Sequence, residues 1–195
     1  MNIFLIRHTK VDLKESTCYG ISDVPLASSF ENEVKFVKKH LANIKNVVYY
    51  SSPSHRCLKL VNQLTKDQPI VDARLCEMNF GDWEMIPWKD LEKIKAFRNW
   101  ADNFVEVQTP NGESYLQLYA RSVEFWEKIS KETQKNIVVI AHGGSIRSIL
   151  AYLNKIHLKD SFKFQIDFHS ITKIEVQKDS EGKIDYKIAY TNKIT

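Results

Sequence analysis

The amino-acid sequence predicts an α/β fold, a three-layer α/β/α sandwich in which a largely parallel central sheet ends in an antiparallel C-terminal edge. Three short apolar runs are separated by segments with helical periodicity, which is the order of parallel strands joined by helices. The C-terminal segment instead alternates apolar and polar residues, which is typical of antiparallel strands. With 195 residues the chain has the length of one domain.

The predicted parallel strands are the three apolar runs. The first, Asn2–Arg7, holds four consecutive apolar residues and fits a strand covered by helices on both faces. The second is Asn46–Tyr50 and the third is Asn136–Ala141, and a shorter apolar stretch is Ile70–Val71. The predicted antiparallel edge is a hairpin whose first strand is Ile171–Gln177.

The second strand of the hairpin is Lys183–Tyr190, where the apolar and polar residues again alternate. Ser180, Glu181 and Gly182 lie between the two strands and favour a turn. We therefore expect this hairpin to close one edge of the sheet.

Two helix starts are recognisable between the first strands. Ser28 and Glu31 fit a capping box, and Pro53 follows Ser52 in the way that proline follows an N-cap residue. Apolar residues recur at helical spacing behind these starts, at Phe30, Val34, Val37 and Leu41 in one helix and at Leu58, Val61 and Leu64 in the other.

The middle of the chain predicts further helices. Pro87 opens a helix that runs past Trp100, and Gly112, Glu113 and Ser114 precede a long amphipathic helix. We expect one domain over residues 1–195, with a helical, cap-like insertion around 87–119.

Composition limits the class of protein and its partners. The net charge of +4 comes from lysines scattered among acids, so we expect no nucleic-acid partner. Arg7 and His8 interrupt the first apolar run, and no run of 18 apolar residues exists, so we expect neither a signal peptide nor a membrane span. Three widely spaced cysteines suggest reduced thiols and a cytoplasmic location. The oligomeric state is left open.

Residues able to bind an anion follow all three of the predicted parallel strands. Arg7, His8 and Thr9 end the first strand, Arg56 lies just after the second, and His142 begins the segment after the third. Because the carboxyl ends of neighbouring parallel strands meet at one edge of a sheet, we expect these cations to converge on one pocket.

The residue types in this pocket predict a phosphate site. A guanidinium supplies two parallel donors to a phosphoryl group, as Arg7 and Arg56 would here. Gly143 and Gly144 open a predicted helix, whose N-terminal amides also favour an anion. No HxxxH or DxD pattern is present, so we expect no metal and no cofactor.

His8 is the candidate nucleophile of this site. A neutral imidazole presents one lone pair, while a hydrogen bond from its other nitrogen aims the ring, and flanking cations lower its pKa. Transfer of phosphorus to His8 would expel an alkoxide that needs a proton. Glu77, in a glycine-containing loop after Ile70–Val71, is the candidate general acid and would later draw a proton from attacking water.

A serine hydrolase is the alternative that Ser145 raises, because it follows the glycine pair Gly143-Gly144. That interpretation needs a GxSxG nucleophile elbow, which this segment lacks. We therefore favour phosphoryl transfer.

These segments together resemble the histidine phosphatase superfamily, also called phosphoglycerate mutase-like. The resemblance rests on its RHG opening, its SSPxxR segment, its LxExxFGxWEG loop and its HGGxxR closing motif, which match in order from Arg7 to Arg147. The resemblance implies a phosphoglycerate mutase-like fold. It also implies that the phosphorylated residue is His8 and that the proton donor is Glu77.

By the same resemblance, Arg7, Arg56 and His142 bind the phosphoryl group and act in catalysis. The expected substrate-binding residues are Arg7, Thr9, Tyr19, Arg56, His142 and Gly143. Trp83 and Trp88, like Tyr19, could stack on a flat substrate base.

Within the superfamily, three segments are most similar to α-ribazole phosphatases: Cys18–Ala27, Glu77–Glu84 and Pro110–Tyr115. The substrate implied is α-ribazole 5′-phosphate, whose hydrolysis to α-ribazole belongs to assembly of the cobalamin nucleotide loop. The alternatives within the fold are a broad-specificity phosphatase, a sugar-phosphate phosphatase and a phosphoglycerate mutase-like enzyme. An inactive phospho-ligand binding protein is an alternative of another class.

Three residues depart from the superfamily pattern. Thr9 stands where glycine usually follows the histidine, and Met85 replaces the glycine of the WEG motif. Lys14 stands where phosphoglycerate mutases carry an asparagine in the phosphate pocket, which weakens the hypothesis of a mutase.

Overall fold

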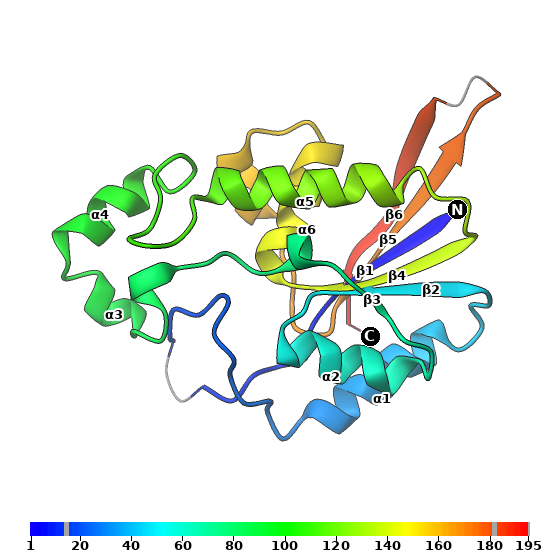
Figure 1. Ribbon diagram of the computed structural model, residues 1–195, viewed down its shortest axis with the longest axis horizontal. Coiled ribbons are helices and arrows are strands. Elements are labelled where there is room, and N and C mark those ends of the chain that lie inside the picture. The colour runs from blue at the N-terminus through cyan, green and yellow to red at the C-terminus, as the bar shows by residue number, and fades with distance from the viewer. Residues whose placement is uncertain (14–15, 181–182, 195) are drawn as a thin grey trace.

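The computed structural model describes residues 1–13, 16–180 and 183–194 and forms a three-layer α/β sandwich (Figure 1). Its sheet has six strands in the order β3-β2-β4-β1-β5-β6. The strands are β1 (Asn2–Arg7), β2 (Val47–Ser51), β3 (Ile70–Val71), β4 (Asn136–Ala141), β5 (Ile171–Lys178) and β6 (Ile184–Lys193). The helices are α1 (Phe30–Leu41), α2 (His55–Leu64), α3 (Trp88–Leu91), α4 (Lys95–Asp102), α5 (Tyr115–Ile129) and α6 (Gly143–Leu153).

The strand directions confirm the predicted sheet. Strands β3, β2, β4 and β1 are parallel, β5 runs antiparallel to β1, and β6 runs antiparallel to β5. The register places Arg7 at the end of β1 opposite Ala141 at the end of β4. The next residues, His8 and His142, therefore leave the sheet side by side.

Side chains from alternate positions of β1 enter two different apolar cores. Ile3 and Leu5 face the layer of α5 and α6, whereas Phe4 and Ile6 face the layer of α1 and α2. All four are at most 4% exposed. A strand buried on both faces is held in place by packing on each side, so the residues at its end are mounted rigidly.

The predicted starts of the first two helices are each off by one or two residues. Helix α1 begins after Ser29, not Ser28, and the Ser29 hydroxyl donates to Glu33 instead of capping a backbone amide. The predicted Ser28 capping box is therefore absent. Helix α2 begins at His55 after Ser54, so Pro53 lies just outside it.

The single helix predicted from Pro87 past Trp100 is in fact two, α3 and α4. Ile94 takes an extended conformation (φ −86°, ψ 126°) between them. The Arg98 guanidinium donates to the carbonyls of Glu92 and Lys93, each at 2.9 Å, which satisfies backbone groups that the break leaves unpaired. The next helix, α5, is capped by Ser114, as its sequence predicts.

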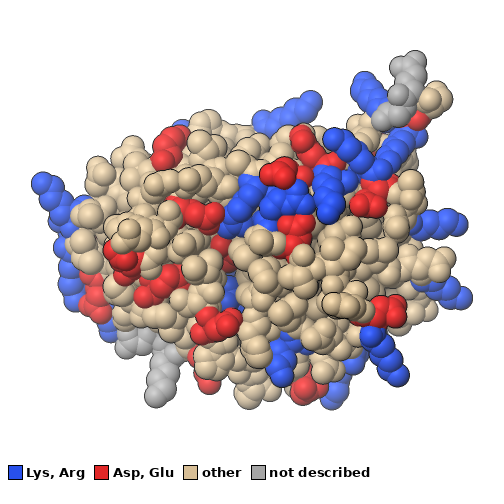
Figure 2. Space-filling model, in the orientation of Figure 1, with Lys and Arg blue, Asp and Glu red and all other residues tan. Residues whose placement is uncertain are grey.

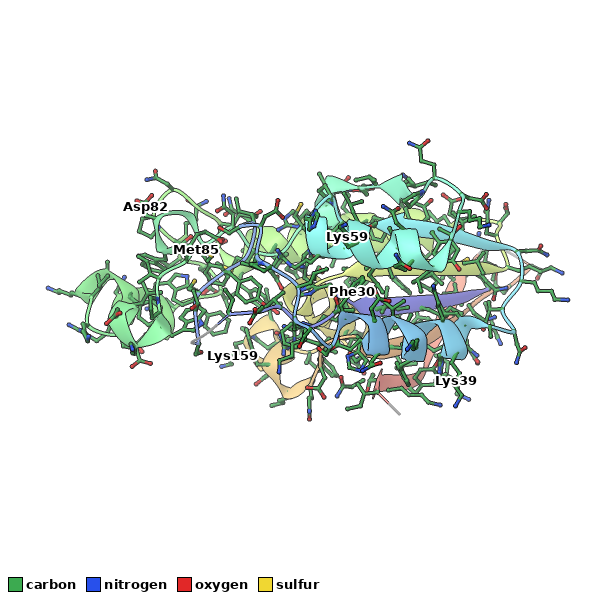
Figure 3. All side chains as sticks on the ribbon, turned by 90° about the horizontal axis from the view of Figure 1, so that it is seen from below. Phe30, Lys39, Lys59, Asp82, Met85 and Lys159 are labelled. Carbon is green, nitrogen blue, oxygen red and sulfur yellow. The ribbon has the colours of Figure 1, made fainter. Side chains whose placement is uncertain are left out.

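The α3–α4 segment lies beyond the carboxyl ends of β1, β4 and β2, at the opposite end of the molecule from the N-terminus (Figure 1). It packs around a third apolar cluster that includes Trp83, Phe97 and Trp100. Figure 3 shows Asp82 and Met85 at this end, whereas Lys39 and Lys59 lie on the helices that cover the sheet.

Some predicted features fall outside the described residues. The turn residues Glu181 and Gly182 and the departure at Lys14 are among them. Within residues 1–13, 16–180 and 183–194, no helix is both long and apolar enough to cross a bilayer.

Candidate active site

A cavity of about 320 Å³ lies at the carboxyl ends of the parallel strands, and Trp88 of α3 and Trp100 of α4 contribute to its lining. Its polar and charged lining includes Arg7, His8, Glu77 and Arg147, together with the backbone of Gly144. These residues come from β1, from the loop after β3 and from the start of α6. Arg56 and His142, which the sequence also predicts in this pocket, do not line the cavity but are buried against His8.

His8 is buried, with 2% of its surface exposed, and its ring orientation is fixed from both sides. Its Nδ1 lies 2.8 Å from the carbonyl oxygen of Thr9, which can only accept, so Nδ1 carries the proton. Its Nε2 is then the lone-pair nitrogen and accepts from Nε of Arg56 at 3.3 Å. Burial, with Arg56 and Arg7 nearby, lowers the pKa of His8 well below its ordinary value, so the ring is neutral at neutral pH.

Arg56 is the most fully enclosed cation of the site, at 1% exposure. It donates to the carbonyls of Ser22, at 2.9 Å, and Gly20. Its guanidinium also reaches Nδ1 of His142 at 3.1 Å. No carboxylate pairs with Arg56 among the described residues, so its positive charge is not neutralised by an acid.

His142 is completely buried beside His8, with the two ring centroids 5.0 Å apart. Its Nδ1 faces the Arg56 donor, and its Nε2 lies 2.9 Å from the Ser52 hydroxyl. Burial and the neighbouring His8 and Arg56 lower its pKa well below the ordinary value. The ring is therefore also neutral.

Arg7 is held by the segment that precedes β5. Its guanidinium donates to the Ile166 carbonyl at 2.7 Å and lies 3.9 Å from the centre of the Phe168 ring. Its Nε is buried without a hydrogen-bond partner. Burial lowers the pKa of Arg7, but an arginine remains charged at neutral pH. A buried donor without a partner is suited to a ligand that brings the acceptor.

Glu77 is fixed against the start of α6. One carboxylate oxygen accepts from the amide of Gly144 at 3.0 Å and the other from the amide of Met78 at 3.0 Å. A Cβ on Gly144 would lie 2.2 Å from Oε1 of Glu77, so only glycine permits this approach. Gly144 thus makes room for the acid.

The loop that carries Glu77 is anchored by Arg121 of α5, a residue that the sequence did not single out. The Arg121 guanidinium pairs with both oxygens of Glu113 at 2.9 Å. It also donates to the backbone carbonyls of Arg74, Cys76 and Glu77 at 2.6–2.9 Å. A lone arginine on a helical surface carries no local pattern that reveals such a contact.

The remaining predicted substrate-binding residues occupy different positions. Tyr19 lines the cavity, with its ring 5.4 Å from the Arg56 guanidinium. Gly143 adjoins Arg7 and Arg147 at the start of α6. Thr9 is fully buried and does not line the cavity, and its contact with the site is its carbonyl bond to His8.

The two tryptophans that the sequence suggests for stacking lie in different places. Trp88 lines the cavity, whereas Trp83 is 4% exposed and packs in the third apolar cluster. The sequence did not identify the other aromatic lining residues, which are Phe80, Trp100, Phe104, Tyr115 and Phe162.

The acidic loop after Glu77 has a structural role at Glu84. Its carboxylate accepts from the amides of Gly20, Ile21, Ser22 and Phe80 and ties two loops together. Met85, next to it, has a positive φ of 65°, a conformation that favours glycine. This explains why the motif that this segment resembles carries glycine there.

In the described part of the chain, no group of three His, Cys, Asp or Glu side chains is arranged to hold a metal ion. On the face shown in Figure 2, lysines and arginines are interspersed with acids and form no continuous basic stripe.

Comparison with known proteins defines the class. The histidine phosphatase superfamily (branch 1) matches residues 3–186. The chain belongs to this superfamily, and it is an enzyme of the phosphatase class that the superfamily defines.

Three relatives show the range within that class. The chain is 28% identical to "Putative phosphoserine phosphatase 2" of Hydrogenobacter thermophilus, over 99% of this chain and 98% of the relative. It is 24% identical to the adenosylcobalamin/alpha-ribazole phosphatase of Escherichia coli, over 86% of each chain. The crystal structure of the alpha-ribazole phosphatase from Shigella flexneri has a TM-score of 0.87 at 20% identity and covers 99% of this chain and 96% of that one, which establishes the fold.

Proposed function

We propose that the protein is a phosphomonoesterase that works through a phosphohistidine at His8. The observation that carries this proposal is the hydrogen bonding of His8, which lines the cavity and keeps its lone pair on Nε2, beside the Arg56 guanidinium. Glu77 lines the same cavity and is the candidate proton donor. Nucleophile, cations and acid are thus present together.

In the first step, Nε2 of His8 attacks phosphorus, so an N–P bond forms and the P–O bond to the leaving group breaks. Protonated Glu77 gives its proton to the departing oxygen, and an alcohol leaves. Arg7, Arg56 and His142 stabilise the charge on the phosphoryl oxygens. The Nδ1 hydrogen bond to Thr9 stabilises the charge that develops on the imidazole.

In the second step, water attacks the phosphohistidine and Glu77 takes a proton from that water. The N–P bond breaks, inorganic phosphate forms and His8 returns to its neutral state. Neither step requires a metal ion or a redox partner.

The reaction is tested by rapid acid-free quenching of the enzyme with a ³²P-labelled phosphomonoester in excess chelator. We expect an acid-labile phosphoprotein, which is absent in His8→Ala, and turnover that persists without metal. Glu77→Gln should lower kcat by about 10²-fold or more, because the general acid is lost. Full turnover by His8→Ala would assign the nucleophile elsewhere, and a chain that binds phosphate but never turns over would be the inactive binding protein.

For the substrate, we propose α-ribazole 5′-phosphate. Two observations support it: the similarity to alpha-ribazole phosphatases and a cavity lined largely with aromatic side chains. A flat base of an aromatic riboside fits such walls.

A substrate panel tests this assignment. We expect kcat/KM for α-ribazole 5′-phosphate to exceed that for phosphoserine, 3-phosphoglycerate and sugar phosphates. Equal values on all four would indicate a broad-specificity phosphatase, and a preference for phosphoserine would agree with the name of the Hydrogenobacter relative. Phosphate transfer to 3-phosphoglycerate instead of water would indicate a mutase.

A further inference from the structure

Two phenylalanines from different parts of the chain contribute to the lining of the cavity. Phe104 follows α4, and Phe162 lies in the 3₁₀ turn Leu158–Lys163 that follows α6. Both line the cavity, and their rings meet edge to face with centroids 5.5 Å apart and planes at 83°. We call these two contacting rings the phenylalanine pair.

The Phe162 side chain is largely exposed to solvent. It is 56% exposed and belongs to none of the three apolar clusters that the described residues form. Its further contacts are the Tyr115 ring, at 5.4 Å between centroids, and the Arg147 guanidinium, 5.2 Å from its ring centre. Exposed phenyl surface is unfavourable in water, and a ligand that covered it would gain free energy on binding.

Few of the groups that line the cavity are charged. In the described chain they are Arg7, Glu77 and Arg147, and Arg147 also contacts the Phe162 ring. The remainder is mainly aromatic and apolar, including Trp88 and Trp100. A small polar leaving group would find few hydrogen-bond partners beside these walls, whereas a flat ring would find edges and faces to pack on.

We propose that Phe162, with Phe104, determines substrate specificity by packing on a flat apolar ring of the leaving group. The substrate class is then a phosphate monoester of an alcohol that carries an aromatic ring a few bonds from the ester oxygen. This inference rests on the proposed phosphatase reaction, and it assigns to the phenylalanine pair the choice among phosphomonoesters.

The test compares esters whose alcohols have similar acidity, so that leaving-group chemistry stays the same. The three substrates are 2-phenylethyl phosphate, 2-cyclohexylethyl phosphate and glycerol 3-phosphate. We expect kcat/KM to fall in that order. Phe162→Ala should lower kcat/KM for the phenyl ester by about tenfold. It should change the value for glycerol 3-phosphate, and the inhibition constant of inorganic phosphate, by less than about twofold.

Two further variants serve as controls. Phe162→Tyr keeps the ring and should retain the preference. Ile70→Ala removes an apolar side chain of similar exposure, 44%, that does not line the cavity, and it should leave all three values unchanged. An equal effect of Phe162→Ala on all three esters, or no effect on any, overturns the proposal.

Failure of the proposed phosphatase reaction can be distinguished from failure of this specificity inference. If none of the esters is hydrolysed, the proposed function is wrong, and binding of 3-phenylpropylphosphonate then decides the inference. Trp88 and Trp100 line the same cavity and report that binding by fluorescence. The dissociation constant is obtained from the saturable quenching. A dissociation constant that rises about tenfold in Phe162→Ala supports the role of the phenylalanine pair, and an unchanged dissociation constant rules that role out.

Discussion

At Gly144, one hydrogen atom in place of a methyl group allows the carboxylate of Glu77 to approach the start of α6. A Cβ there would lie 2.2 Å from Oε1 of Glu77 and 2.8 Å from Leu118. Neither distance is compatible with van der Waals contact, so the carboxylate would have to move. The neighbouring Gly143 is less constrained, since a Cβ there would meet the flexible end of Arg147 at 3.0 Å.

We therefore expect Gly144→Ala to reduce kcat by about 10²-fold on alkyl phosphate esters, because the displaced acid no longer protonates the leaving group. The loss should be much smaller for p-nitrophenyl phosphate, whose leaving group needs no proton. Gly143→Ala is the matched control and should cost less than about tenfold on either ester. Steady-state kinetics measure the loss of kcat on each of the two esters. Equal losses in the two variants would show that Glu77 is not the group affected.

At the scale of elements, the position of the loop between β3 and α3 depends on α5. Arg121 makes two bonds to Glu113 and three to backbone carbonyls of residues 74–77, and Glu113 in turn accepts from the amide of Asn79. The Arg121 and Glu113 side chains are 18% and 24% exposed, so solvent screens the pair only partly. This network joins a rigid helix to the loop that carries the acid.

Arg121→Met should lower kcat by about tenfold and leave the inhibition constant of inorganic phosphate nearly unchanged, because the acid is displaced while the cations stay in place. It should also lower the free energy of unfolding by about 1–3 kcal/mol, since several backbone carbonyls lose their donor. Kinetics, phosphate inhibition and urea unfolding provide the three readouts.

Arg74→Met is the control for that variant. Arg74 pairs with Asp72 and Glu124 near the surface, so its loss should cost less than about 1 kcal/mol and should not change kcat. If both variants lost activity to the same extent, the role of Arg121 as an anchor for Glu77 would be untenable.

At the scale of the whole molecule, burying two neutral histidines makes folding sensitive to pH. The pKa values of His8 and His142 are both lowered well below the unfolded value of about 6.5. The unfolded chain therefore binds more protons than the folded one once the pH falls below about 6.5. The stability that these residues contribute is fully present above that pH and is lost as the pH falls.

We expect the free energy of unfolding to be nearly flat from pH 8 to 7 and to fall below pH 6.5. Each histidine contributes a slope that approaches about 1.4 kcal/mol per pH unit. Urea unfolding between pH 5 and 8 measures this, above the range in which Asp72 and Glu84, whose pKa values are lowered, begin to titrate.

His8→Asn and His142→Asn should each reduce the slope, and His55→Asn, which alters an exposed side chain, should not. A slope that survives in His8→Asn and His142→Asn alike would mean that other groups cause the acid sensitivity.

The sequence by itself determined the sheet and the convergence of the anion-binding residues. Runs such as Asn2–Arg7 and Asn136–Ala141 have a local pattern that reveals burial on both faces, and parallel strands bring their carboxyl ends to one edge. The strand pattern alone therefore predicts that His8 and His142 lie close together. The helix starts at Ser29 and Ser54 were missed by one or two residues, because neither serine caps its helix through its side chain and the local pattern does not choose between neighbouring serines.

Only the tertiary structure decided what surrounds those residues. The break at Ile94, the anchor at Arg121, the stacking of Phe168 on Arg7 and the exposed ring of Phe162 all depend on contacts between segments distant in the chain. An aromatic residue has the same local pattern whether it fills a core, as Trp83 does, or lines a cavity, as Trp88 does. Periodicity reports which face of an element is apolar, and the packing partner of that face is fixed only when all the elements assemble.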